Sequence, residues 1–173
     1  RALEGLKPIL IYPVAGLLII GLFMCVVNPI VGAINTGLYS GLEAMGAGSK
    51  VLLGIVLAGM MAIDMGGPFN KAAYVFGTST LATVAAGQGS DIMAAVMVGG
   101  MVPPIAIALA TTFFKSRFTQ EERKSGPVNY IMGLCFITEG AIPYAAADPL
   151  HVLLACVIGS RVSGALSLAL GGA

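Results

Sequence analysis

Residues 51–71 of the chain read VLLGIVLAGMMAIDMGGPFNK, and this stretch decides the architecture. Residues 51–63 are apolar, but they fall short of the roughly 20 residues that a helix needs to cross a bilayer. Asp64, two glycines and a proline follow, and a second short apolar run occupies residues 72–86. Glycine and proline between short apolar runs are typical of membrane helices that are broken inside the bilayer. The stretch therefore predicts two half-helices around a break.

The composition excludes most other classes of protein. The chain has 173 residues, of which 57% are hydrophobic and 10% are charged, whereas soluble domains carry about 25% charged residues. Nine basic and eight acidic side chains cannot coat a soluble globule of this size. A formal net charge of +1 provides no basic surface, so no nucleic-acid partner is expected. What remains is an integral membrane protein surrounded by the lipid bilayer.

Two segments precede the broken stretch. Residues 9–27 contain no charged side chain and predict the first membrane-spanning helix, which Asn28-Pro29 is expected to end. Residues 31–49 are rich in Gly and Ala and carry one acid, so they predict an interfacial or packed amphipathic helix.

Two longer spans follow the broken stretch. Residues 92–114 predict a spanning helix with a kink at Pro103-Pro104, and the last span reaches Leu170. Between them, a charged loop at about residues 115–127 holds four basic side chains, which indicates the cytoplasmic side. The predicted fold is all-α: a single polytopic membrane domain over residues 1–173, with broken helices and re-entrant hairpins.

The cysteines do not form a pattern of their own. Cys25, Cys135 and Cys156 lie in apolar runs, without a CxxC pair or a histidine at metal-ligand spacing. Packing accounts for them, and neither a metal ion nor another cofactor is expected. Because the chain opens with Arg1 rather than an initiator methionine, we expect it to start inside a longer protein.

Polar residues gather in two islands of this apolar sequence. They are candidates for binding a substrate: Asp64, Gly66, Gly67, Asn70 and Lys71 in the first island, and Thr138, Glu139, Asp148 and His151 in the second. Broken backbone inside lipid is expected only beside protein or a water-filled cavity. Acids, amides and backbone groups there supply the directed hydrogen bonds that a sugar requires. A lone carboxyl in an apolar run, as at Glu139, is expected to be protonated, paired or functional.

Several of these residues also have a simpler structural interpretation. Asp64 and Lys71 would make a structural ion pair at a helix break, and Asn70 would serve as a cap. Asp148-Pro149 is the N-cap and first-turn signature of a helix, and His151 would be a satisfied histidine in that first turn. Composition and spacing leave these alternatives open.

Both islands resemble a known family. The matching stretches are residues 64–74, DMGGPFNKAAY, and residues 137–150, ITEGAIPYAAADPL. They are similar to the fructose-specific enzyme II, C component, of the bacterial phosphoenolpyruvate-dependent phosphotransferase system, and the intervening spans resemble it too. The chain looks like the C-terminal, substrate-binding portion of such a C domain.

The resemblance implies a permease of the bacterial inner (plasma) membrane that binds fructose and phosphorylates it during uptake. A cytoplasmic B component would donate the phosphoryl group from a phosphocysteine. The chain would then be the membrane component of a sugar phosphotransferase, an enzyme that needs the B component for its chemistry. Related C components are dimers, which implies a homodimer.

The resemblance also implies roles for individual residues. In the relatives, a glutamate in a Gly-Ile-Thr-Glu type of motif binds the sugar near the hydroxyl that is phosphorylated, and this catalytic role maps onto Glu139. Phe136 replaces the leading glycine of that motif, as fits the fructose branch. His151 stands where fructose relatives usually carry arginine.

A different class of transporter fits the same residues. An ion-coupled sugar symporter would use Asp64 or Glu139 as a proton carrier and would transfer no phosphoryl group. Its uptake would collapse with the proton gradient. A non-transporting membrane scaffold would leave Glu139 and the broken segments without a purpose.

Overall fold

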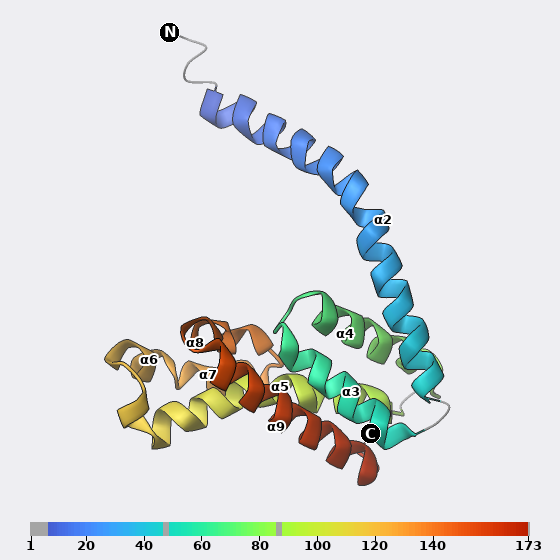
Figure 1. The fold of residues 1–173 in the computed structure, drawn as a ribbon, viewed down its shortest axis with the longest axis vertical. Helices are drawn as coiled ribbons and strands as arrows, with labels where there is room; N and C mark the ends of the chain where they lie inside the picture. The colour runs from blue at the N-terminus through green and yellow to red at the C-terminus, as the bar shows by residue number, and fades with distance from the viewer. Residues whose placement is uncertain (1–6, 47–48, 86–87, 173) are drawn as a thin grey trace. The chain divides into compact units, whose positions relative to one another are not determined.

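A computed structural model gives the fold of residues 7–46, 49–85 and 88–172. These residues contain helices and no strand, which confirms the all-α class for this part of the chain (Figure 1). The helices are η1 (Lys7–Ile11), α2 (Tyr12–Gly46), α3 (Lys50–Ile63), α4 (Pro68–Leu81), α5 (Asp91–Phe113), η2 (Lys115–Arg117), α6 (Gln120–Ser125), α7 (Val128–Leu134), η3 (Thr138–Ala141), α8 (Ile142–Ala147) and α9 (Pro149–Ala169). The chain divides into two compact units, Arg1–Ser40 and Gly41–Ala173, so the single domain stays a prediction.

α2 accounts for most of the first unit. It is one helix of 35 residues with Pro29 inside it, so the expected end at Asn28-Pro29 and the separate helix over residues 31–49 are both wrong. Pro29 removes only the N–H that would bond to the carbonyl four residues earlier. Membrane helices tolerate such a loss, because neighbouring groups satisfy the freed carbonyl.

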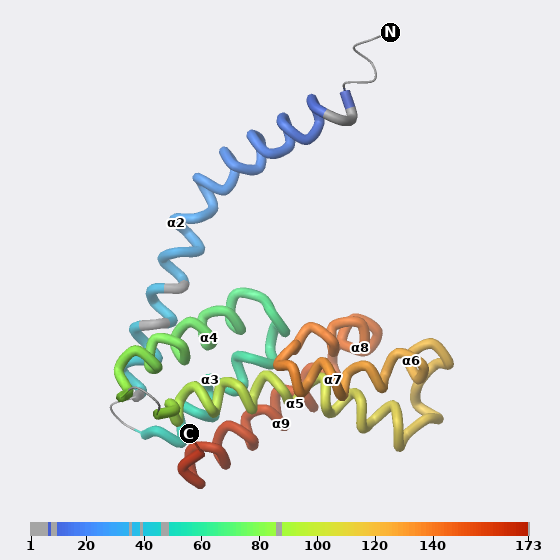
Figure 2. Tube along the Cα trace, turned by 180° about the vertical axis from the view of Figure 1, so that it is seen from behind, coloured from blue at the N-terminus to red at the C-terminus, as the bar shows by residue number. Residues whose placement is uncertain are grey.

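Three helices of the second unit, α3, α5 and α9, pack side by side (Figures 1 and 2). Small residues make their contacts, as expected in lipid, where close approach of backbones supplies the attraction between helices. A β-carbon on Gly99 of α5 would lie 2.6 Å from the Cα of Ala58 in α3. One on Gly54 of α3 would lie 2.8 Å from the carbonyl oxygen of Gly164 in α9. Larger side chains at these glycines would push the three helices apart.

α3 and α4 form a hairpin that returns toward the end from which it started. Lys50 at the start of α3 makes a 2.8 Å ion pair with Asp91 at the start of α5, so both helices begin at the same end. α3 has 14 residues and is roughly 21 Å long, which is short of a hydrocarbon core of roughly 30 Å. The chain turns at residues 64–67 and returns as α4. The predicted break is thus present, and Pro68 already begins α4 because proline fits the first turn of a helix.

α7, η3 and α8 form a second hairpin, which approaches from the opposite end of α5. Gly126, just before α7, packs against Thr111 in the last turns of α5, whereas Gly133 packs against Ile105. α7 therefore runs back along α5 toward its middle. α8 returns, since the hydroxyl of Tyr144 donates a 3.0 Å hydrogen bond to a backbone carbonyl of α6.

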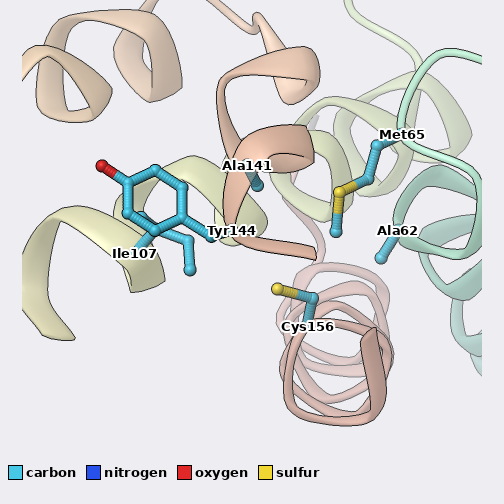
Figure 3. Packing of buried hydrophobic residues seen from close by; sticks show 6 residues of the cluster. All are labelled: Ala62, Met65, Ile107, Ala141, Tyr144 and Cys156. Atoms are coloured by element: carbon cyan, nitrogen blue, oxygen red, sulfur yellow. The ribbon is translucent and has the colours of Figure 1, made fainter. Parts of the chain in front are cut away.

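The tips of the two hairpins share an apolar core beside α5. Figure 3 shows its buried residues: Ala62 and Met65 from the first hairpin, Ile107 from α5, Ala141 and Tyr144 from the second hairpin, and Cys156 from α9. Because these side chains come from four separate stretches of sequence, their packing holds the two tips at a fixed spacing.

Within the residues that the structure describes, three helices are long and apolar enough to cross a membrane: Tyr12–Met45, Asp91–Phe113 and Pro149–Ala169. The predicted spans over residues 92–114 and up to Leu170 correspond to the second and third of these. α9 begins as predicted, with Pro149 in its first turn and Asp148 as its N-cap. The polytopic membrane fold is therefore confirmed.

Candidate functional site

Pro103-Pro104 leaves two backbone carbonyls of α5 free to accept hydrogen bonds from other elements. Neither proline has a backbone N–H, so the carbonyls of Gly99 and Gly100 lose their helical partners four residues on. Ser160 of α9 donates a 2.8 Å hydrogen bond to the carbonyl of Gly99, and Thr138 of η3 donates a 3.0 Å bond to that of Gly100. Since a freed carbonyl in lipid costs several kcal/mol, the second of these bonds anchors the tip of the hairpin on α5.

Glu139, the next residue, lies against the tip of the first hairpin. A β-carbon built on Gly66 would come within 2.6 Å of Glu139 Oε1. Gly66 has φ +114°, a conformation that glycine adopts without steric cost. Glycine at this position therefore permits the turn and leaves room for the carboxylate. The two polar islands, about 70 residues apart in sequence, meet at this contact.

A cavity of about 270 Å³ lies where the hairpins meet. Its lining combines an amide, an ammonium group, a hydroxyl and a carboxylate with two aromatic rings. The lining residues are Asn70, Lys71, Tyr74, Phe136, Thr138 and Glu139. Pockets for small molecules begin at roughly 300 Å³, so this one suits a ligand no larger than a monosaccharide. Four of the predicted site residues are thus brought together.

The aromatic pair is the part of this site that the sequence interpretation missed. Tyr74 and Phe136 stack with ring centroids 5.9 Å apart and an angle of 30° between their planes. Tyr74 follows the first polar island in sequence, and Phe136 precedes the second. This closeness in sequence is the signal that could have identified both rings as part of the site. Phe136 has φ +61°, a strained backbone for a residue with a β-carbon. A glycine at position 136 would adopt this conformation without strain.

Asn70 and Lys71 enter the cavity from the first turn of α4. Asn70 is buried, and its Nδ2 donates a 2.9 Å hydrogen bond to the carbonyl of Met61 in α3. This bond ties the two arms of the hairpin together, because the Met61 carbonyl lies in the last turn of α3. Lys71 is exposed and has no ion-pair partner among the described residues.

Asp64 lies at the same break but outside the cavity. Its Oδ2 accepts a 2.7 Å hydrogen bond from the N–H of Phe69, and its Oδ1 accepts a 2.9 Å bond from that of Asn70. A β-carbon on Gly67 would lie 2.6 Å from Asp64 Oδ2, so Gly67 leaves room for this carboxylate. Asp64 therefore caps the start of α4, and the structure records no ion pair between it and Lys71 within the described chain.

Asp148 and His151 belong to a second cavity, of about 440 Å³. That cavity also contains Arg117, Glu122 and Tyr144. His151 Nδ1 lies 2.9 Å from both carboxylate oxygens of Asp148, and this hydrogen bond holds the pKa of the Asp148 carboxyl below its usual value. The structure does not bring these two residues to Glu139.

Known proteins resemble the chain along nearly its whole length. It is 54% identical over 168 residues to the PTS system fructose-specific EIIABC component of Bacillus subtilis, covering 96% of this chain and 26% of that protein. It is equally similar to the fructose permease IIC component of Bacillus amyloliquefaciens, of which it covers 54%. It is 46% identical over 173 residues to the PTS system fructose-specific EIIB'BC component of Escherichia coli, covering 99% of this chain and 30% of that protein.

The chain therefore spans between about a quarter and about half of the length of these curated relatives. No family model matches it, and no solved structure matches it. The resemblance noted in residues 64–74 and 137–150 is confirmed. Together with the helices long enough to span a bilayer, the similarity places the chain in the inner (plasma) membrane as a multi-pass protein.

Proposed function

This chain is a homologue of the fructose-specific C components of phosphotransferase systems, and from that premise we propose that it binds fructose and passes it through the membrane with coupled phosphorylation. The chain would act as the sugar-binding part of the membrane component of a sugar phosphotransferase. A B component would supply the phosphoryl group from a phosphocysteine. We further propose that the protein works as a homodimer in the bilayer.

The observation that carries the proposal is the cavity between the two hairpin tips. It joins hydrogen-bonding groups from both islands to an aromatic pair, and it has the size of one sugar ring. The faces of the two rings suit the C–H face of a sugar, and the polar groups suit its hydroxyls. All the lining residues of this site come from the two hairpins, as expected for a binding site built from broken helices.

Glu139 is the proposed catalytic residue. Its carboxylate would accept a hydrogen bond from the reacting hydroxyl of the sugar and take the proton as the oxygen attacks phosphorus. The new O–P bond would form as the S–P bond of the phosphocysteine breaks, and the cysteine would leave as a thiolate. Phosphoryl transfer depends mainly on positioning and on stabilising charge at the transferring oxygens, and Lys71 would supply positive charge in the same cavity.

The other candidate residues take different parts in this proposal. Asn70 and Thr138 would bind hydroxyls of the sugar, while Asp64 would act through the cap that places α4. Gly66 and Gly67 would act through the backbone, by leaving room for the carboxylates of Glu139 and Asp64. For Asp148 and His151 we propose contact with the sugar outside the Glu139 cavity, in the second cavity next to the charged loop.

The experiment uses membranes that contain the full-length protein, labelled fructose and the phosphorylated B component. Accumulation of labelled sugar phosphate is expected, and Glu139→Gln should reduce its formation by at least about 100-fold, the lower end of what general-base catalysis contributes. Glu121→Gln, which alters an exposed carboxylate of α6, is the matched control and should behave as wild type. Free sugar that accumulates only with a proton gradient would contradict phosphoryl transfer and favour an ion-coupled symporter.

A further inference from the structure

A third cavity, of about 480 Å³, lies at the end of α5, and it differs from the cavity lined by Glu139 in charge. Three cations line it, Lys115, Arg123 and Lys124, together with the amide of Gln120 and the hydroxyl side chains of Thr111 and Thr112. None of its described lining residues is acidic. The proposed transport cycle makes no use of this cavity.

None of the three cations forms an ion pair with an acidic side chain among the described residues. The ion pairs recorded in the described chain join Lys50 to Asp91 and His151 to Asp148, and neither involves this cavity. Glu122 of α6 is engaged at the helix start, where its Oε2 accepts hydrogen bonds of 2.8 and 2.9 Å from the N–H and hydroxyl of Thr119. The cavity therefore carries a concentrated positive charge that an anion can complete.

The hydroxyl groups of the cavity already have acceptors. Thr111 Oγ1 donates to the carbonyls of Ile107 and Ala108 at 2.9 and 3.0 Å, and Thr112 Oγ1 donates to that of Ala108 at 2.7 Å. The donors left for a ligand are two ammonium groups, a guanidinium and one amide. Such a set suits a phosphate group, whose several oxygens accept charge-assisted hydrogen bonds at once.

The position of the cavity along α5 favours a lipid headgroup as the source of the phosphate. Thr111 and Thr112 lie in the last turn of a helix that is long enough to span the membrane, and the end of such a helix is expected at the level of lipid headgroups. Phe113 and Phe114, which stand in sequence between the lining residues Thr112 and Lys115, are 72% and 65% exposed. Aromatic residues gather at this level of the bilayer, and basic pockets at the ends of membrane helices bind anionic headgroups.

We propose that this cavity binds the headgroup phosphate of an anionic phospholipid, with its acyl chains lying along Phe113 and Phe114. The cations would bind the phosphate, and the aromatic rings would contact the acyl chains, which a free phosphate ion lacks. The proposal is independent of the sugar that the protein carries, because the cavity shares no lining residue with the Glu139 cavity.

The test uses the full-length protein in nanodiscs of phosphatidylcholine, with and without phosphatidylglycerol, and counts retained lipids by native mass spectrometry. Wild-type protein should retain phosphatidylglycerol selectively. The triple variant Lys115→Gln/Arg123→Gln/Lys124→Gln should lose at least about tenfold in affinity, since each basic residue near a membrane surface adds to the attraction of anionic lipid. Arg117→Gln is the matched control: it removes one charge from the same loop, but Arg117 lines the other cavity.

Three results would overturn the proposal. Equal losses in Arg117→Gln and in the single Lys115→Gln variant would indicate unspecific surface charge. Displacement of phosphatidylglycerol by millimolar inorganic phosphate would indicate a site for free phosphate. Displacement by the phosphorylated B component, with no selectivity for phosphatidylglycerol in its absence, would indicate a protein-docking surface.

Discussion

The hydroxyl of Thr138 donates a 3.0 Å hydrogen bond to the carbonyl of Gly100, a carbonyl that the proline four residues later cannot satisfy. A proline in α5 thus determines where the tip of the second hairpin docks. The same arrangement occurs one residue earlier, where Ser160 occupies the carbonyl of Gly99. The two carbonyls that the consecutive prolines leave free therefore anchor one hairpin and one helix on α5. Of these two elements, only the hairpin carries the proposed catalytic carboxylate.

Thr138→Val should lower the free energy of unfolding by about 1–3 kcal/mol, because the carbonyl of Gly100 is left buried without a partner. It should also lower sugar phosphorylation through Glu139. Adding Pro104→Ala supplies a new N–H for that carbonyl, so the double variant should recover part of the stability but not the activity. Thermal unfolding in detergent and phosphorylation assays measure the two effects.

Ser160→Ala with Pro103→Ala is the matched pair at the neighbouring carbonyl. It should reproduce the stability effects with a smaller loss of activity, since Ser160 lies on α9 rather than on the hairpin. Equal losses of activity in the two pairs would contradict a specific role of Thr138 in placing Glu139.

Gly66→Ala should reduce sugar phosphorylation strongly, because the new β-carbon would stand 2.6 Å from Glu139 Oε1. The substitution also strains the backbone at φ +114°, so a control for strain is required. Gly171→Ala provides it: Gly171 has φ +70°, and a β-carbon there would meet nothing within 4 Å. If Gly171→Ala impaired phosphorylation equally, the contact between Gly66 and Glu139 would not be the cause.

The strained backbone of Phe136 predicts an unusual order of stability. Phe136→Gly should be more stable than Phe136→Ala by about 1 kcal/mol, because both lose the ring but only glycine relieves the positive φ. Both variants should weaken fructose binding, since both lose the stack with Tyr74. Unfolding midpoints compare the two stabilities, and an alanine variant that is at least as stable as glycine would rule out strain at this position.

Asp64 should contribute to stability as a helix cap and not as an ion-pair partner. Asp64→Ala is expected to cost about 1 kcal/mol, the usual effect of losing an N-cap. Because no ion pair joins Asp64 to Lys71, a double-mutant cycle with Lys71→Gln should give a coupling energy close to zero. A clear favourable coupling would restore the ion-pair interpretation.

Asp148 predicts a pH dependence with a definite sign. Its pKa is lowered by the hydrogen bond from His151, so its ionised form is favoured in the folded state. The stability that it contributes is present above its ordinary pKa of about 4, and it is lost as the pH falls through the lowered value. Wild type should thus be more stable than Asp148→Asn at neutral pH. Unfolding measured from pH 7 down to about pH 3 should show this advantage disappear, and a difference that grew on acidification would contradict the assignment.

The sequence by itself determined the class of the fold and the local elements. Apolar runs too short to cross a bilayer, interrupted by Gly66, Gly67 and Pro68, require broken helices, because every backbone group in lipid must find a partner. Asp148-Pro149 marked the start of α9 correctly, since a cap and a first-turn proline act within a few residues. Asn28-Pro29 was misinterpreted because a single proline removes one hydrogen bond, and whether that ends a helix depends on its surroundings.

Only the tertiary structure decided which polar residues share a cavity. Pro103-Pro104 frees two carbonyls in any fold, but the sequence does not say that Thr138 and Ser160 will occupy them. Glu139 meets Gly66, and Tyr74 stacks on Phe136, because the two hairpins enter along α5 from opposite ends. Asp148 and His151, close to Glu139 in sequence, lie in another cavity because α8 turns the chain away. Such contacts join distant segments, so packing between helices fixes them and local sequence does not.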